Sequence, residues 1–160
     1  MGRFAKVRVA WMQRAVSSLD RIAARRGPSS VPAHLLIGSE GEDAAFFHLR
    51  RKGYTVVARR WSCGDRPGDI DLIAWQGTLL CFVEVKTRTA QDMTPAEAAV
   101  DRHKRNVLRR LARSYLRQLP RAAMPQVRFD VMSVYIVPGQ QKQIIHFENA
   151  FEWNETREKG

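Results

Sequence analysis

The sequence contains little cysteine, little negative charge and no long apolar run. Its two cysteines, Cys63 and Cys81, are too few for a disulfide framework, and no Cys-x-x-Cys spacing suggests a zinc site. We therefore expect a reducing, cytoplasmic setting, with Cys81 as a small core residue. The longest apolar stretch, Leu79 to Val85, is far shorter than the roughly 20 residues of a membrane span. No transmembrane segment is predicted.

Acidic residues are outnumbered by basic ones, 16 to 27, and the formal net charge is +11. Such an excess favours a polyanionic partner, and nucleic acid is the usual one. DNA is expected more than RNA, although the sequence does not decide between them. A surface charged only for solubility is the alternative.

Residues 1–32 differ in composition from the rest. Their apolar residues follow helical spacing, and Gly27-Pro28 ends the pattern. A basic amphipathic extension and linker is expected there. A solvated extension is the preferred interpretation, with contact to a membrane, a partner or nucleic acid as alternatives. The Arg-rich composition also resembles a transit peptide.

The remaining pattern predicts an α/β domain over residues 33–153 and a polar tail at 154–160. Helices are expected at 38–52, ending at Gly53, and at 94–118, where Thr94-Pro95 would begin the helix. Between and after them the sequence predicts strands at 54–58, 70–75, 78–86, 127–137 and 143–147. A two-residue turn, Gln76-Gly77, would join the second and third strands. This order predicts a mixed sheet flanked by helices.

Three charged residues on the predicted hairpin suggest a metal site. Because side chains alternate along a strand, Glu84 and Lys86 share one face, while Val83 and Val85 take the other. The hairpin would bring Asp71 near Glu84. Two carboxylates suit a hard divalent cation such as Mg²⁺. Lys86 could then orient water or stabilise developing charge. A surface ion pair on an edge strand is the alternative.

Two further features are less specific. Glu42 could join the carboxylates, although acids also favour helix N-termini because of the helix dipole. The 94–118 helix is rich in basic residues that could contact phosphates, or could simply be solvated. The candidates for nucleic-acid binding are Lys104, Arg105, Arg109 and Arg113.

Taken together, these motifs resemble the YraN-like bacterial family. They are Gly41-Glu42, Gly53-Tyr54, Gly68-Asp69-Ile70-Asp71 and Phe82-Val83-Glu84-Val85-Lys86-x-Arg88, and the resemblance runs from Ile37 to Val137. That family is usually described as uncharacterised. It is placed in the restriction-endonuclease-like, PD-(D/E)XK superfamily, beside archaeal Holliday-junction resolvases.

The resemblance implies a nuclease core in which the catalytic residues are Glu42, Asp71, Glu84 and Lys86. It also implies that the three carboxylates bind Mg²⁺ or Mn²⁺, that Asp69 and Arg88 support them, and that a homodimer is one option. One departure is Asp69, because the family usually has a Glu there, which is one methylene longer.

The function expected from the sequence is a divalent-metal-dependent endonuclease acting on DNA, with branched or single-stranded DNA as candidate substrates. The alternative is a nucleic-acid-binding protein that keeps the nuclease fold without turnover. The sequence leaves the substrate structure, the catalytic activity and the oligomeric state open.

Overall fold

The structure is a computed structural model, and it describes residues 33–64, 66–89, 100–120 and 124–153. The expected N-terminal extension, the Thr94-Pro95 helix start and the polar tail lie outside these residues. In the described part of the chain, no helix is both long and apolar enough to cross a membrane.

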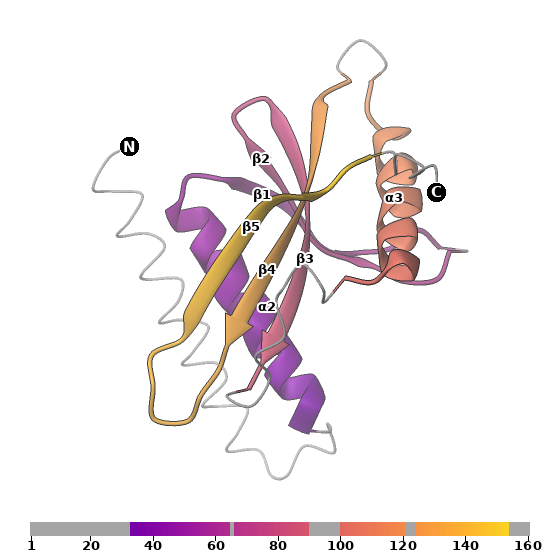
Figure 1. Ribbon diagram of the computed structural model, residues 1–160. Coiled ribbons are helices and arrows are strands. Elements are labelled where there is room, and N and C mark those ends of the chain that lie inside the picture. Colours follow the sequence, from indigo (N-terminus) through magenta and orange to yellow (C-terminus); the bar gives the residue numbers. More distant parts are fainter. Residues whose placement is uncertain (1–32, 65, 90–99, 121–123, 154–160) are drawn as a thin grey trace, which may run out of the picture.

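Two helices cover opposite faces of one five-stranded sheet (Figure 1). The strands lie in sequence order, and every neighbouring pair is antiparallel except β3 and β4, which are parallel. The helix α3 lies in the connection between these two. The elements are α2 (Ala33–Arg51), β1 (Thr55–Trp61), β2 (Ile70–Gln76), β3 (Leu79–Arg88), α3 (Arg102–Leu116), β4 (Gln126–Tyr135) and β5 (Gln143–Phe151). The predicted α/β class and mixed sheet are confirmed, and the arrangement is consistent with a restriction-endonuclease-like core.

Both helices begin at other residues than predicted. The helix α2 begins at Ala33, five residues before the expected Gly38, and ends as expected before Gly53, whose φ is 94°. The prediction of one continuous helix over 94–118 is wrong, because Asp101 has extended backbone and α3 begins at Arg102. The side chain of Asp101 accepts the Lys104 amide, which makes Asp101 the N-cap.

The strands are longer than predicted except β4, which ends at Tyr135, two residues before the predicted Val137. The β2–β3 turn consists of Gly77 and Thr78 rather than Gln76 and Gly77, with Gly77 at φ 60°. The last strand continues past the predicted Phe147 to Phe151, after an irregularity in its pairing with β4. Sequence periodicity misses such extensions because an irregularity breaks the alternation.

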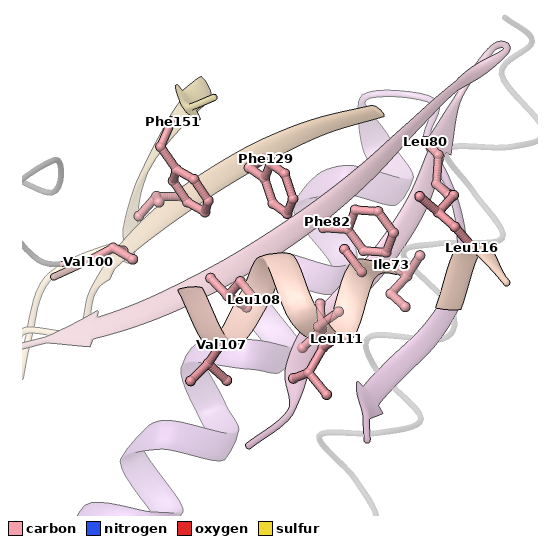
Figure 2. Packing of buried hydrophobic residues seen from close by; sticks show 13 residues of the cluster. Ile73, Leu80, Phe82, Val100, Val107, Leu108, Leu111, Leu116, Phe129 and Phe151 are labelled. Atoms are coloured by element: carbon pink, nitrogen blue, oxygen red, sulfur yellow. The ribbon is translucent and has the colours of Figure 1, made fainter. Parts of the chain in front are cut away.

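Side-chain alternation along β3 builds two separate cores. Phe82 faces α3, where it packs with Phe129, Leu108 and Leu111 (Figure 2). Val83 faces the opposite way, toward α2. Cys81 is a buried free thiol on that side, as expected, and Cys63 is also free.

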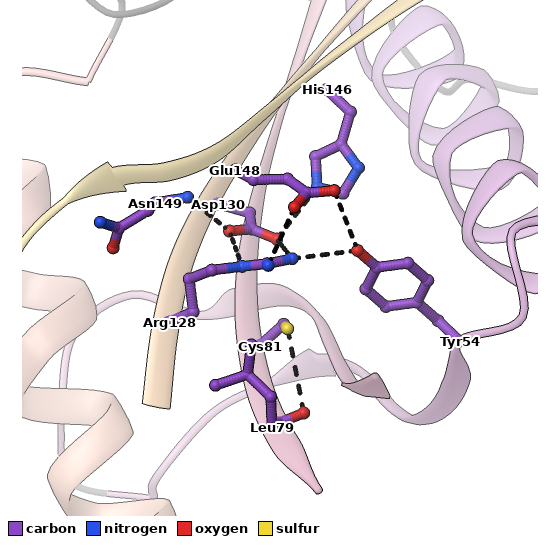
Figure 3. Close-up of polar contacts among 8 residues, drawn as sticks. All are labelled: Tyr54, Leu79, Cys81, Arg128, Asp130, His146, Glu148 and Asn149. Atoms are coloured by element: carbon purple, nitrogen blue, oxygen red, sulfur yellow. Dashed lines mark hydrogen bonds and ion pairs between the residues drawn. The ribbon is translucent and has the colours of Figure 1, made fainter. Parts of the chain in front are cut away.

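A buried polar network joins β4 to β5 on the α2 side of the sheet (Figure 3). Asp130 is fully buried and accepts hydrogen bonds from Arg128 and from the backbone amide of Asn149. Its carboxylate also contacts the ring nitrogen Nε2 of His146. Arg128 also donates to Glu148. The network holds the irregular end of β5 against the sheet.

Candidate metal centre

Glu84 is the most buried carboxylate on the α3 side of the sheet. It lies on β3, two residues after the core residue Phe82 and therefore on the same face of the strand, and its side chain is 2% exposed. Lys86 Nζ lies 2.9 Å from its Oε1, and Lys104 Nζ lies 3.1 Å from its Oε2. A buried carboxylate is thus held between one lysine from its own strand and one from α3, which compensates its charge.

Asp71 faces Glu84 from the neighbouring strand. Leu72 pairs with Val83 in the antiparallel register, so the next position along brings Asp71 beside Glu84. Asp71 Oδ2 accepts a hydrogen bond of 2.6 Å from the Val85 amide. Burial, together with the negative charge of Glu84, raises the pKa of Asp71 to about 7, although the Val85 hydrogen bond and Lys104 act in the opposite direction.

Glu42 lies within electrostatic reach of Asp71 but is bound to another residue. Its carboxylate forms a two-bond ion pair with Arg60, at 2.6 Å from Nε and 3.0 Å from Nη2. Among the described residues, no three acidic, histidine or cysteine side chains lie close enough together to hold one ion. The structure therefore brings Asp71 and Glu84 together and leaves Glu42 beside them, paired with Arg60.

The two expected supporting residues both lie beyond this pair, toward the open end of the β2–β3 hairpin. Asp69 is partly buried in front of β2, and its charge acts on both Arg60 and Lys104. Arg88 is buried on β3, two alternations beyond Glu84 on the same face.

Two residues of the site were not predicted as such. Lys104 was expected on a nucleic-acid surface, but it points inward to Glu84. Burial works to lower the pKa of Lys104, but the negative charges of Glu84, Asp71 and Asp69 outweigh burial and raise the pKa. Arg60 was not singled out at all. Its backbone has φ 46°, which is unusual for a residue with a side chain. That conformation carries no signal in a single sequence.

The basic surface of α3 also differs from the expectation. Arg109 is buried and donates to the backbone carbonyl of Glu152, and Arg105 donates to that of Val100. Of the predicted residues, Arg113 is exposed, with its guanidinium 5.2 Å from the ring of Trp153. The arginines exposed on α3 and at its C-cap are Arg102, Arg110, Arg113 and Arg117. At 100° per residue their positions fall within about 80° of one another, so they form one stripe, the α3 arginine stripe.

The chemistry of the paired carboxylates fits a hard divalent cation. Glu84 Oε2 is buried and, within the described part of the chain, receives no well-directed hydrogen bond even though Lys104 is close. Burial and the charge of Glu84 raise the pKa of Asp71, and a cation between the two carboxylates would act in the opposite direction. Mg²⁺ is commonly held by one or two carboxylates and several waters. Asp71 and Glu84 supply that donor set.

Comparisons with known proteins identify one family. The family described as "Uncharacterised protein family UPF0102" matches residues 41–134. A UPF0102 protein of Koribacter versatilis is 51% identical over 105 residues, covering 66% of this chain and 72% of that protein. One from Solibacter usitatus is 45% identical, covering 73% and 83%, and one from Pelotomaculum thermopropionicum is 38% identical, covering 74% and 98%. The matched residues include both carboxylates of the site and both of its lysines.

Proposed function

Since the chain belongs to the uncharacterised protein family UPF0102, we propose its function from the site itself: metal-dependent hydrolysis of phosphodiester bonds in DNA. The observation that carries the proposal is the pair formed by Asp71 and Glu84, which face each other on adjacent strands with two lysines beside them. Asp71 and Glu84 would hold Mg²⁺ or Mn²⁺.

The bound metal would supply positive charge to the phosphate and would make its bound water more acidic. Lys86 supports hydrolysis because its side chain is about one-third exposed while its ammonium is bound to Glu84. It can therefore reach a ligand without leaving the carboxylate, and can stabilise charge that develops on the phosphate. Lys104 is more deeply placed, so its role is to hold Glu84 in position.

Nucleic acid as the substrate is supported by charge. The net charge is +11, and α3 displays the arginine stripe while its first residues include Lys104 of the site. Arginine residues on one face of a helix can follow successive phosphates. By the same count of 100° per residue, Lys104 lies at least about 120° around the helix from every arginine of the stripe. DNA strands that leave the site, whether branched or single-stranded, could be held along this outer face of α3.

The test is cleavage of a panel of linear, single-stranded and branched DNAs with Mg²⁺ or Mn²⁺. Glu84→Gln and Asp71→Asn remove charge with little change of shape, and each should lower the rate about a hundredfold or more. Asp43→Asn is the matched control, since Asp43 pairs with Arg59 and not with the site. The proposal fails if wild type and both site variants act alike on every substrate.

A second candidate function is nucleic-acid binding without turnover, favoured by the α3 arginine stripe alone. This function requires no metal. It predicts DNA binding that weakens steeply with salt, that is unchanged by a chelator and that is unchanged in Glu84→Gln. Binding that needs a divalent cation would contradict it.

A further inference from the structure

Arg60 lies on β1, the edge strand beside the candidate metal centre. Its backbone has φ 46°, a conformation that disfavours residues with a side chain. The side chain is 54% exposed, yet it is oriented by two bonds to Glu42. An exposed, oriented guanidinium on strained backbone needs a reason.

The β1–β2 register places Arg60 beside the site, because Arg59 pairs with Leu72 and the next position along brings Arg60 opposite Asp71. After Glu42, the negative charges that act most strongly on it are those of Asp69 and Asp71. Lys86 and Lys104 are both bound to Glu84 and less exposed than Arg60. Arg60 is therefore the cation of this group that is most open to an incoming ligand.

The need for an ion pair between α2 and β1 does not explain the unusual backbone of Arg60, because the adjacent residue already forms such a pair. Arg59 pairs with Asp43 of α2, and its guanidinium lies 5.1 Å from the ring of Phe46 on the same helix. Among the described residues other than glycine, positive φ occurs at Arg60 and Asn149. Arg59 therefore forms its contacts with α2 without an unusual backbone conformation.

We propose that Arg60 binds a phosphodiester group of the nucleic acid at the site, and that Glu42 is its positioning residue. The guanidinium fork matches two phosphate oxygens. Glu42 is only 16% exposed and occupies Nε and Nη2, whereas the Arg60 side chain is 54% exposed. A phosphate can therefore bind the Nη1 side of the guanidinium while Glu42 keeps its contact. This inference rests on the proposed function, and it gives Glu42 a role other than metal ligand.

The test is equilibrium binding of a fluorescent single-stranded DNA to the full chain, in Ca²⁺ and over a range of salt concentrations. Arg60→Ala should weaken binding about fivefold at low salt and reduce the slope of log affinity against log salt by about 0.7, the value for one phosphate contact. Arg60→Lys should restore part of the affinity. Arg59→Ala, which removes the same charge one residue away, should leave the slope unchanged.

Equal changes of slope in Arg60→Ala and Arg59→Ala would overturn the inference, because charge alone would then explain both. Glu42→Gln gives a second measurement. If Arg60 only joined α2 to β1 through Glu42, this variant should lose as much DNA affinity as Arg60→Ala. If Glu42 positions Arg60 for the phosphate, the slope of log affinity against log salt should be kept, because Arg60 is still present. If the wild-type chain binds no nucleic acid, the nucleic-acid part of the proposed function fails as well. Thermal unfolding of each variant shows whether it is folded.

Discussion

Lys104 Nζ, on α3, lies 3.1 Å from Glu84 Oε2, on β3. This contact joins the crossover helix to the strand that carries the candidate metal centre. It means that the helix is part of the site rather than only a surface for ligands. The same contact links the stability of the fold to the candidate metal centre through one lysine.

We expect Lys104→Ala to lower the free energy of unfolding by about 1–3 kcal/mol, because a buried carboxylate loses one of its two cations. Arg110→Ala is the matched control on an exposed position of the same helix, and should change stability by less than about 0.5 kcal/mol. Urea unfolding with a chelator present measures both. Equal stability of the two variants would show that Lys104 does not compensate Glu84.

Asp71→Asn should make the metal-free protein more stable at neutral pH. Burial and Glu84 raise the pKa of Asp71 from 3.8 to about 7, so the native state favours the protonated carboxyl more than the unfolded chain does. That contribution to stability is complete below the unfolded pKa and is lost as pH rises through about 7. Asn cannot ionise and can still accept the Val85 hydrogen bond.

The measurement is the difference in unfolding free energy between Asp71→Asn and wild type, in a chelator, from about pH 4 to 8. It should be near zero at the acid end and should grow with pH in favour of the variant. A constant difference would contradict the raised pKa. A site that costs stability when empty is expected where function and stability oppose each other.

Two glycines of α2 should respond in opposite ways to alanine. A Cβ atom at Gly41 would lie 1.9 Å from Thr87 Oγ1 and 2.9 Å from Thr87 Cβ, whereas a Cβ at Gly38 would meet nothing within 4 Å. Gly41→Ala should therefore push α2 from β3 and destabilise by about 1–3 kcal/mol. Gly38→Ala should stabilise by about 0.5–1 kcal/mol through helix propensity.

Thermal or urea unfolding of the two variants gives the result directly. Stabilisation by both would mean that α2 does not approach β3 at Thr87. Since Gly41 precedes Glu42 and Thr87 follows Lys86, Gly41→Ala should also weaken metal binding, measured by titration calorimetry with Mn²⁺.

The Asp130 network is expected to stabilise the fold without contributing to the site. Burial works to raise the pKa of Asp130, but hydrogen bonds from His146, Arg128 and the Asn149 amide outweigh it and hold the pKa below its usual value. Its contribution is therefore present above the usual carboxyl pKa and is lost as pH falls through the lower, native value. Asp130→Asn should destabilise by about 2–5 kcal/mol at neutral pH, because Arg128 loses its buried partner (Figure 3).

Glu148→Gln is the control for this variant, since Glu148 bonds to the same Arg128 but is 44% exposed. Its effect should stay below about 1 kcal/mol. Binding of Mn²⁺ should be the same in both variants while they are folded. A selective loss of metal binding in Asp130→Asn would link the two faces of the sheet.

Local rules were sufficient for the strand part of the site. Alternation along a strand puts Glu84 and Lys86 on one face, and a short hairpin brings Asp71 beside Glu84. The error in the turn, by one residue, shifts the pairing by two residues: a Gln76-Gly77 turn would put Asp69 opposite Glu84, whereas the observed turn puts Asp71 there. Because the shift is even, the same face of the hairpin still carries the site. Gly53 likewise marked the end of α2 as predicted.

By itself, then, the sequence determined the order of the elements, the α/β class and the face that carries Asp71, Glu84 and Lys86, since each depends on neighbours along the chain. Only the tertiary structure decided that Lys104 turns inward, that Arg109 is buried and that Arg60 pairs with Glu42. These facts depend on how α2 and α3 are rotated against the sheet. That rotation follows from the packing of whole faces, which no local spacing of charged residues records.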